Sequence, residues 1–170
     1  MNPAFLGDSY DIVKRFFVRE LQSMNYAVEI DPMFTGDWAG REGDFRRLLG
    51  VGAPVSPSVR STRRALFLDP DTGVNERGGK QHVALARMAL EVQAWELVFA
   101  FDQSFSRQAQ PIDVMKRKMT LLSEAGARSM YYDSHAKFLF ASSRGELLQD
   151  LVGHLVQVGV PRLRFVSDDA

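Results

Sequence analysis

Carboxylates follow the most apolar segments of the chain, and this placement is the pattern most suggestive of chemistry. The stretch "ALFLDPDTGV" at residues 65–74 ends in Asp69 and Asp71. Further strand-forming segments end in Asp31, Asp102 and Asp133. Because the carboxyl ends of parallel strands meet at one edge of a sheet, where ligands of open α/β sheets bind, we expect these side chains to form a rim. The alternative is a set of local turns, in which proline and glycine shape the backbone and aspartate caps the next element.

Two kinds of chemistry suit such a rim. Clustered carboxylates bind magnesium or manganese, and a metal held by Asp69, Asp71 and Asp102 would serve a phosphodiesterase or nuclease. Without a metal, the rim would grip a positively charged guest or accept hydrogen bonds from an amine. In both interpretations Asp69, Asp71 and Asp102 are the candidate catalytic residues.

Arginine is concentrated between residues 41 and 64, where six arginines accompany two acidic residues. One interpretation is a patch that contacts the phosphates of a nucleic acid, with Arg41 and Arg64 binding substrate. The alternative is a solvated loop whose arginines pack along their neighbours. The formal net charge of the whole chain is zero, which argues against a dedicated, strongly basic nucleic-acid binder.

The length of 170 residues predicts one domain, 1–170, with a substantial core, and the 45% hydrophobic content is typical of globular proteins. The chain contains no cysteine, which excludes disulfides, zinc–thiolate sites and a cysteine nucleophile. No apolar run has the length of a membrane span, and the first residues lack a secretory signal pattern. We therefore expect no membrane partner and a cytoplasmic location.

Hydrophobic periodicity predicts that helices and strands alternate. Helices are expected over residues 8–24, near Phe45 and Leu49, over 78–94 and 110–126, and from a Ser143–Glu146 capping box to Gly159. Strands are expected at residues 26–30, 65–69, 95–102, 129–133, 137–142 and 162–166, and a loop at 50–62. Strands that are apolar throughout imply burial on both faces. The expected fold class is therefore α/β, a three-layer Rossmann-like sandwich with a mostly parallel sheet and a terminal hairpin.

The opening stretch "GDSYDIVKRFFVRELQSMNYAVEIDPMFTG" resembles the start of the bacterial 23S ribosomal RNA adenine-N6 methyltransferases. These begin with a Gly-Asn-x-x-Asp-Val-Leu-Lys helix, whose places are taken here by Gly7, Asp11 and Lys14. Further on, "LFLDPDTG" is similar to the Asp-Pro-Pro-Tyr motif of that group. It is closer to the Asp-Pro-x-Gly strand end of the three-Cys-motif partner proteins, which belong to the same superfamily.

The resemblance implies a methyltransferase-like fold with S-adenosylmethionine as cofactor. It places the cofactor near Gly7, Lys14, Asp31 and Gly36. It places the substrate near Asp69, Pro70 and Thr72, at the loop that holds the target amine.

The chain departs from that family in three places. The usual Gly-x-Gly turn after the first strand is replaced by "DPMFTGDW", where bulky Met33 and Phe34 would hinder close approach of a ligand to the backbone. The second and third strands of the family correspond to a short loop, so the fold is expected to be truncated. Asp71 and Thr72 stand where Pro-Tyr would stack on a flat base.

Three functions follow as hypotheses. The first is a divergent methyltransferase that acts on an amine of a nucleic acid or nucleotide. The second is a magnesium- or manganese-dependent phosphodiesterase or nuclease. The third is a non-catalytic, partner-binding domain of methyltransferase descent, for which the loop at 50–62 would be a natural contact segment.

Overall fold

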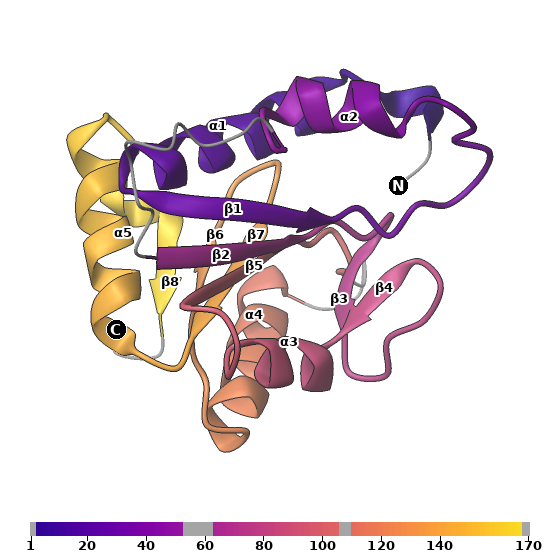
Figure 1. The fold of residues 1–170 in the computed structure, drawn as a ribbon. Helices are drawn as coiled ribbons and strands as arrows, with labels where there is room; N and C mark the ends of the chain where they lie inside the picture. Colours follow the sequence, from indigo (N-terminus) through magenta and orange to yellow (C-terminus); the bar gives the residue numbers. More distant parts are fainter. Residues whose placement is uncertain (1–2, 53–62, 106–109, 168–170) are drawn as a thin grey trace.

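The computed structural model describes residues 3–52, 63–105 and 110–167, which form an α/β fold in three layers (Figure 1). The central sheet has six strands in the order β1 (Tyr26–Asp31), β2 (Arg63–Leu68), β5 (Leu97–Phe101), β7 (Phe138–Ser142), β6 (Arg128–Tyr132) and β8 (Phe165–Ser167). The helices are α1 (Ser9–Ser23), α2 (Glu42–Leu49), α3 (Leu85–Glu91), α4 (Pro111–Glu124) and α5 (Gly145–Gln157). A separate parallel pair consists of β3 (Gly73–Asn75) and β4 (His82–Ala84).

Four of the six strands run in the same direction. β1, β2 and β5 pair in parallel, whereas β7 lies antiparallel between β5 and β6. β6 therefore points the same way as β5, and β8 closes the sheet antiparallel to β6. The predicted mostly parallel sheet and the predicted β6–β7 hairpin are both confirmed.

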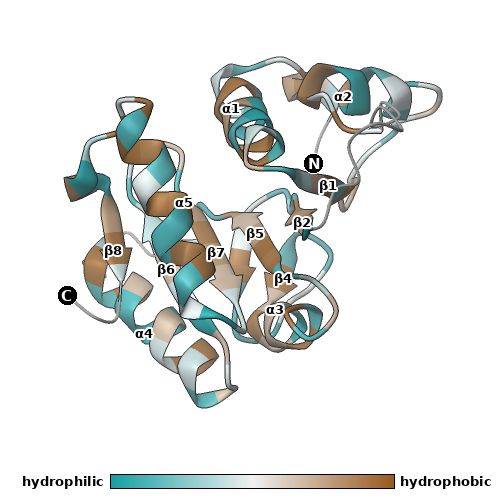
Figure 2. Ribbon diagram, turned by 60° about the vertical axis from the view of Figure 1, so that its left-hand side comes forward, coloured by the Kyte–Doolittle hydropathy of each residue, from teal (hydrophilic) through white to brown (hydrophobic). Residues whose placement is uncertain are grey.

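The helices cover both faces of the sheet, as Figures 1 and 2 show. One core cluster joins α1, α2 and α5 to the sheet through Phe17, Phe45 and Leu151. The other joins α3 and α4 to the opposite face through Met88 and Met119. The central strands carry apolar side chains toward both clusters, and every residue of β5 and β7 is buried. Continuous hydrophobicity in these strands is explained by burial on both faces.

The helices that follow β1 and β2 lie on opposite faces of the sheet. α2 packs in the cluster of Phe17, and α3 packs in the cluster of Met88. The chain therefore leaves the carboxyl ends of β1 and β2 toward helices on opposite faces of the sheet. This is the edge at which the sequence predicts a carboxylate rim.

Local capping explains several helix ends. Asp8 caps α1 by accepting a hydrogen bond from the Asp11 backbone N–H at 3.0 Å. Pro111 is the first residue of α4, and Gly126 follows its end with a φ of 84°. These ends agree with the sequence prediction.

Two predicted helix starts are wrong. The helix expected from residue 78 begins at Leu85, because His82–Ala84 forms β4 and pairs with β3, which buries Val83. The expected capping box before α5 does not form, since Arg144 is the N-cap and makes no side-chain capping bond. Ser142, one position before the predicted cap, accepts the Arg144 N–H instead.

The segment at 162–166 is part 3₁₀-helix, Arg162–Arg164, before β8. Most of the loop expected at 50–62 lies outside the described residues.

Candidate functional site

The predicted rim exists as a shared edge of the sheet. Asp31, Asp69, Asp102 and Asp133 directly end or follow β1, β2, β5 and β6, whose carboxyl ends point the same way. The Asp69 backbone N–H donates to the Asp31 carbonyl at 2.9 Å, so these two positions are adjacent. The side chains nevertheless enter different environments, and each must be considered in its own contacts.

Asp69 belongs to a buried ion cluster with Lys14 and Asp11. The Lys14 Nζ lies 3.0 Å from an oxygen of each carboxylate, and both carboxylates are completely buried. Lys14 reaches them from one helical turn after Asp11, whose second oxygen accepts the Gly7 N–H at 2.8 Å. Gly7 adopts a φ of 87°, which favours glycine. The structure thus brings together Gly7, Lys14 and Asp69, which the sequence assigned to cofactor and substrate.

Burial and charge act against each other in this cluster. Burial alone would lower the pKa of Lys14, but the negative charges of Asp69 and Asp11 outweigh it and raise the pKa above its usual value. Burial also raises the pKa of Asp69, opposed by the attraction of Lys14. The Asp69 Oδ1 lies within ion-pair distance of Lys14 but accepts no hydrogen bond. The cluster therefore holds Lys14 charged while leaving Asp69 short of hydrogen-bond donors.

A cavity of about 350 Å³ lies beside this cluster, and we call it the Tyr10 cavity. Its walls come from the start of α1 and from the loops that follow β2 and β5. Polar and charged residues around it include Asp8, Asp11, Lys14, Asp71 and Gln103. Aromatic side chains supply much of the remaining wall. Tyr10 stacks on His135 with a centroid distance of 4.9 Å and meets Phe101 edge-on at 5.2 Å.

The loop from Asp69 to Gly73 forms one side of the Tyr10 cavity through Pro70 and Asp71. Asp71 accepts hydrogen bonds from the Thr35 hydroxyl at 3.0 Å and the Gln81 amide at 3.3 Å. The Thr72 backbone bonds to Gln81 and Gln103, and the Thr72 side chain does not line the cavity.

Gly73 allows this loop to approach β5 closely. A Cβ atom at this position would lie 2.3 Å from the Asp102 Oδ1 and 2.7 Å from the Gln103 backbone nitrogen. The glycine also has a φ of 143°, outside the range that side chains favour. The Asp-x-Asp-Thr-Gly order therefore contains a packing requirement as well as candidate ligands.

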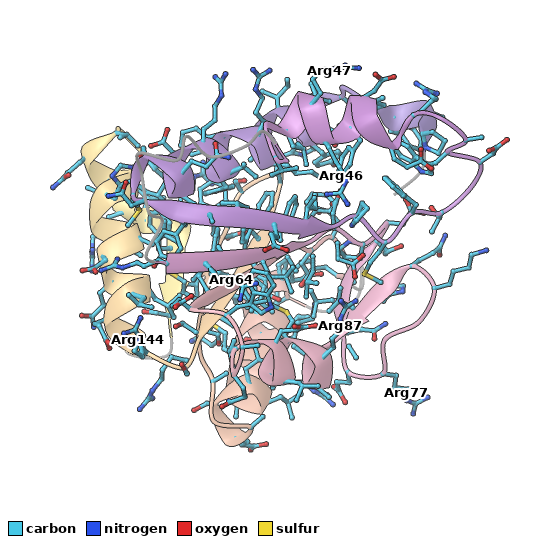
Figure 3. All side chains as sticks on the ribbon, in the orientation of Figure 1. Arg46, Arg47, Arg64, Arg77, Arg87 and Arg144 are labelled. Carbon is cyan, nitrogen blue, oxygen red and sulfur yellow. The ribbon has the colours of Figure 1, made fainter. Side chains whose placement is uncertain are left out.

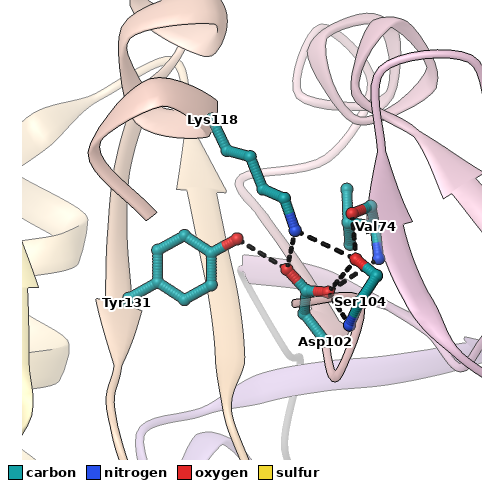
Figure 4. Close-up of polar contacts among 5 residues, drawn as sticks. All are labelled: Val74, Asp102, Ser104, Lys118 and Tyr131. Atoms are coloured by element: carbon teal, nitrogen blue, oxygen red, sulfur yellow. Dashed lines mark hydrogen bonds and ion pairs between the residues drawn. The ribbon is translucent and has the colours of Figure 1, made fainter. Parts of the chain in front are cut away.

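Asp102 lies at the centre of a second network, on the other face of the sheet (Figure 4). Its Oδ1 accepts the N–H groups of Val74 and Ser104, at 2.9 and 3.0 Å, and the Ser104 hydroxyl at 2.7 Å. Its Oδ2 accepts Lys118 Nζ and the Tyr131 hydroxyl, both at 2.6 Å. Five donors thus converge on one carboxylate that is completely buried. This arrangement ties β3, β5, β6 and α4 together.

Burial dominates the ionisation of the groups around Asp102. It lowers the pKa of Lys118, although the Asp102 charge opposes the shift. Burial raises the pKa of Tyr131 well above 10.0, and the neighbouring Asp102 charge raises it further. The tyrosine is therefore held as a neutral hydrogen-bond donor. Asp102 itself does not line the Tyr10 cavity.

The turn after β1 does not reach the Tyr10 cavity. Asp31 binds Arg87 at 2.7 Å and the Met33 N–H at 3.1 Å. Phe34 stacks on Trp38 at 4.3 Å, which directs this turn into the core. Gly36 adopts a φ of 78°, and a Cβ atom at this position would contact only Pro3. Asp31 and Gly36, expected near a cofactor, are therefore not among the residues that line the Tyr10 cavity.

The arginines expected to contact phosphate are dispersed. Figure 3 shows Arg46 and Arg47 on α2 and Arg64 on β2. Arg41 is exposed just before α2, whereas Arg64 lies at the amino end of β2, roughly 16 Å along the strand from Asp69. Arg64 stacks over Trp95 at 4.0 Å and lies 3.4 Å from Glu29. Arg64 thus belongs to the opposite edge of the sheet.

Sequence reasoning missed the contacts of Lys14 with Asp11 and Asp69 and those of Asp102 with Lys118 and Tyr131. Asp11 is three residues before Lys14, a spacing that signals a helical ion pair, but it also lies four residues before Arg15. Lys118 and Tyr131 carry no local signal, because they reach Asp102 from 16 and 29 residues away.

Other candidate sites have less support. Within residues 3–52, 63–105 and 110–167, no group of three His, Asp or Glu side chains is placed to hold a metal ion. None of the described helices combines the length and apolarity that crossing a membrane requires. A cavity of about 760 Å³ lies between β6, α5 and β8, near Arg128 at the amino end of β6. It is lined by none of the candidate catalytic, cofactor-binding or substrate-binding residues, so the Tyr10 cavity remains the candidate site.

A scan against protein-family models found no match for this chain, and searches of curated proteins and of solved structures also returned none.

Proposed function

We propose that this protein is a divergent methyltransferase-like protein that binds S-adenosylmethionine in the Tyr10 cavity and transfers its methyl group to an amine. The observation that carries the proposal is the composition of the cavity wall. The segment that resembles the methyltransferase opening supplies Tyr10, Asp11 and Lys14, and the segment that resembles the Asp-Pro motif supplies Pro70 and Asp71. Two segments more than 50 residues apart in sequence meet around one cavity.

The size and place of the cavity support a small ligand. Its volume of about 350 Å³ lies within the range of small-molecule sites, which is roughly 300–1,000 Å³. It opens at the carboxyl ends of the parallel strands β2 and β5, which is the side of the sheet where open α/β sheets bind ligands. Aromatic rings and carboxylates in the wall suit a ligand that carries positive charge.

S-adenosylmethionine would supply an electrophilic methyl group on a sulfonium. Transfer to the lone pair of an acceptor amine would release S-adenosylhomocysteine as the leaving group, and the amine proton would pass to water. The chain's own residues would position the reactants. Asp71 and Gln103 line the cavity and provide hydrogen-bonding groups, whereas Asp69 is buried behind Lys14 and acts as a positioning residue for it. The resemblance implies an acceptor amine in a nucleic acid or nucleotide.

Calorimetric titration tests the binding step. We expect micromolar affinity for S-adenosylmethionine, weakened at least tenfold by Tyr10→Leu. The matched control is Ile12→Ala on the same helix, because Ile12 is 54% exposed and does not line the cavity. The absence of heat with both S-adenosylmethionine and its demethylated product would refute the proposal. Transfer of labelled methyl groups to RNA or nucleotides would then identify the acceptor.

A non-catalytic, partner-binding domain is the second candidate, and one observation favours it. Asp69 and Asp102, two of the carboxylates expected to perform chemistry, are completely buried and bonded within the protein. Binding of S-adenosylmethionine without methyl transfer to any tested acceptor would support this candidate. The metal-dependent phosphodiesterase has no such support, because five donors already occupy Asp102.

A further inference from the structure

We propose that the Tyr10 cavity selects organic cations, in which a sulfonium or an alkylammonium centre carries the charge, over neutral or anionic ligands of similar shape. The inference rests on the proposed function, because it concerns the ligand class of the same site. It goes further by predicting that S-adenosylmethionine binds much more tightly than its neutral-sulfur product.

The buried ion cluster shows how this part of the protein accommodates a cation. The Lys14 ammonium lies between the carboxylates of Asp11 and Asp69 and 5.0 Å from the centroid of the Phe101 ring. Two carboxylates and an aromatic face are the surroundings that stabilise an alkylammonium away from water. Lys14 lies in the wall of the cavity, so the same chemistry continues to the surface of the cavity.

The rest of the cavity wall also contains carboxylates and aromatic rings. Asp8 and the Tyr10 and Phe5 rings line the cavity near the start of α1, and Phe5 is 60% exposed. Among the described wall residues, Lys14 is the cation, and its charge is already balanced by Asp11 and Asp69. Along this described part of the wall, the carboxylates of Asp8, Asp11 and Asp71 outnumber the one ammonium, so a ligand with net negative charge would meet more negative than positive charge there.

The amino end of α1 does not reverse this preference. A helix N-terminus attracts anions through its unpaired N–H groups. Here the carboxylate of Asp8 accepts the Asp11 N–H at 3.0 Å, and the carboxylate of Asp11 accepts the Gly7 N–H at 2.8 Å. The protein's own carboxylates thus take the place that a bound anion would occupy.

The variant Asp8→Asn tests the charge of the cavity wall without removing the cap of α1. Asparagine caps a helix about as well as aspartate does, so the variant removes a negative charge from the cavity while keeping the α1 cap. A unit charge about 6 Å away in surroundings of high dielectric changes affinity by about three- to tenfold. We expect this loss for S-adenosylmethionine and less than a twofold change for S-adenosylhomocysteine. Asp113→Asn, an exposed change on α4, is the matched control and should alter neither affinity.

The experiment is a set of calorimetric titrations of the intact protein with four probes: S-adenosylmethionine, S-adenosylhomocysteine, tetramethylammonium and adenosine monophosphate. We expect at least tenfold tighter binding of S-adenosylmethionine than of S-adenosylhomocysteine, and competition by tetramethylammonium. Raising the salt concentration should weaken binding of both cations. If Asp8→Asn does not fold, the comparison of Tyr10→Leu with Tyr10→Phe tests the cation selectivity through the aromatic wall instead. Only the leucine variant lacks a ring, so only it should lose the preference for S-adenosylmethionine.

The outcomes distinguish this inference from the proposed function. Equal affinity for the two adenosyl compounds, with no effect of Asp8→Asn, would overturn the cation selectivity and leave cofactor binding intact. Binding of tetramethylammonium without either adenosyl compound would support the selectivity and overturn the proposed function. Tighter binding of adenosine monophosphate than of the cations would overturn the selectivity, and the failure of all four probes would overturn both.

Discussion

Replacing Asp102 by asparagine tests the network at the centre of the fold. Five donors converge on its two oxygens, and an asparagine side chain offers one oxygen and an NH₂ group. Either orientation leaves at least one group that can only donate facing the NH₂ group: the Lys118 ammonium in one, the N–H groups of Val74 and Ser104 in the other. The substitution also removes the counter-ion of Lys118, whose side chain is only 7% exposed.

The size of the effect follows from these losses. Breaking a buried ion pair by removing one partner costs about 3–5 kcal/mol. A domain of this size has a total unfolding free energy of about 5–15 kcal/mol, so the loss is a large fraction of it. At roughly 2–4 °C per kcal/mol, the melting temperature should fall by about 6–20 °C. Asp113→Asn, exposed on the same helix as Lys118, should cost less than about 1 kcal/mol.

Urea unfolding followed by tryptophan fluorescence measures the unfolding free energies of these variants, since Trp38 is buried in the core. Lys118→Met combined with Asp102→Asn completes a double-mutant cycle. We expect the double variant to be more stable than the sum of the single losses predicts, because each single change leaves the other partner uncompensated. A loss below 1 kcal/mol in Asp102→Asn, or strict additivity in the cycle, would refute the network's role.

Three further predictions concern the same contacts. Gly73→Ala should destabilise the protein by about 1–3 kcal/mol more than Gly79→Ala, because both glycines have φ near 144° but only the first Cβ would meet backbone atoms; urea unfolding of the pair measures the difference. Tyr131→Phe should make the unfolding free energy fall less steeply above pH 10. The pKa of Tyr131 is raised in the folded protein, so its contribution to stability is present below pH 10 and is lost as the pH rises through the folded pKa. Equal slopes of unfolding free energy against pH in variant and wild type would contradict this. Lys14→Met should cost about 3–5 kcal/mol at pH 8 and less at pH 5. Burial raises the pKa of Asp69, and the variant lacks the Lys14 charge that opposes this shift, so protonation of Asp69 relieves part of the uncompensated charge at low pH; a loss that is the same at both pH values would argue against a charged cluster.

The fold was largely predictable because its strongest signals are local. β5 is apolar throughout and β7 is apolar up to Ser142 because both faces of these strands are buried, and the alternation with amphipathic helices identifies an α/β sandwich. The cap at Asp8 and the proline at the start of α4 follow from backbone hydrogen bonding alone. β3 and β4 could not be predicted, since each has three residues and forms only because the other is beside it.

The site was predictable in position and less so in detail. Parallel strand ends place Asp69 and Asp102 on one edge, as expected, but the alternation of side chains along a strand and the helices on each face decide what each carboxylate meets. Asp69 meets Lys14, and Asp102 meets Lys118 and Tyr131. Contacts between residues so distant in the chain leave no spacing pattern in the sequence.

The most direct test of the account is to soak crystals of the protein separately with S-adenosylmethionine and with manganese. We predict density for S-adenosylmethionine in the Tyr10 cavity, between Tyr10 and Pro70, and no manganese beside Asp69. Manganese bound at Asp69 and Asp71, with the Tyr10 cavity unchanged by S-adenosylmethionine, would contradict the account.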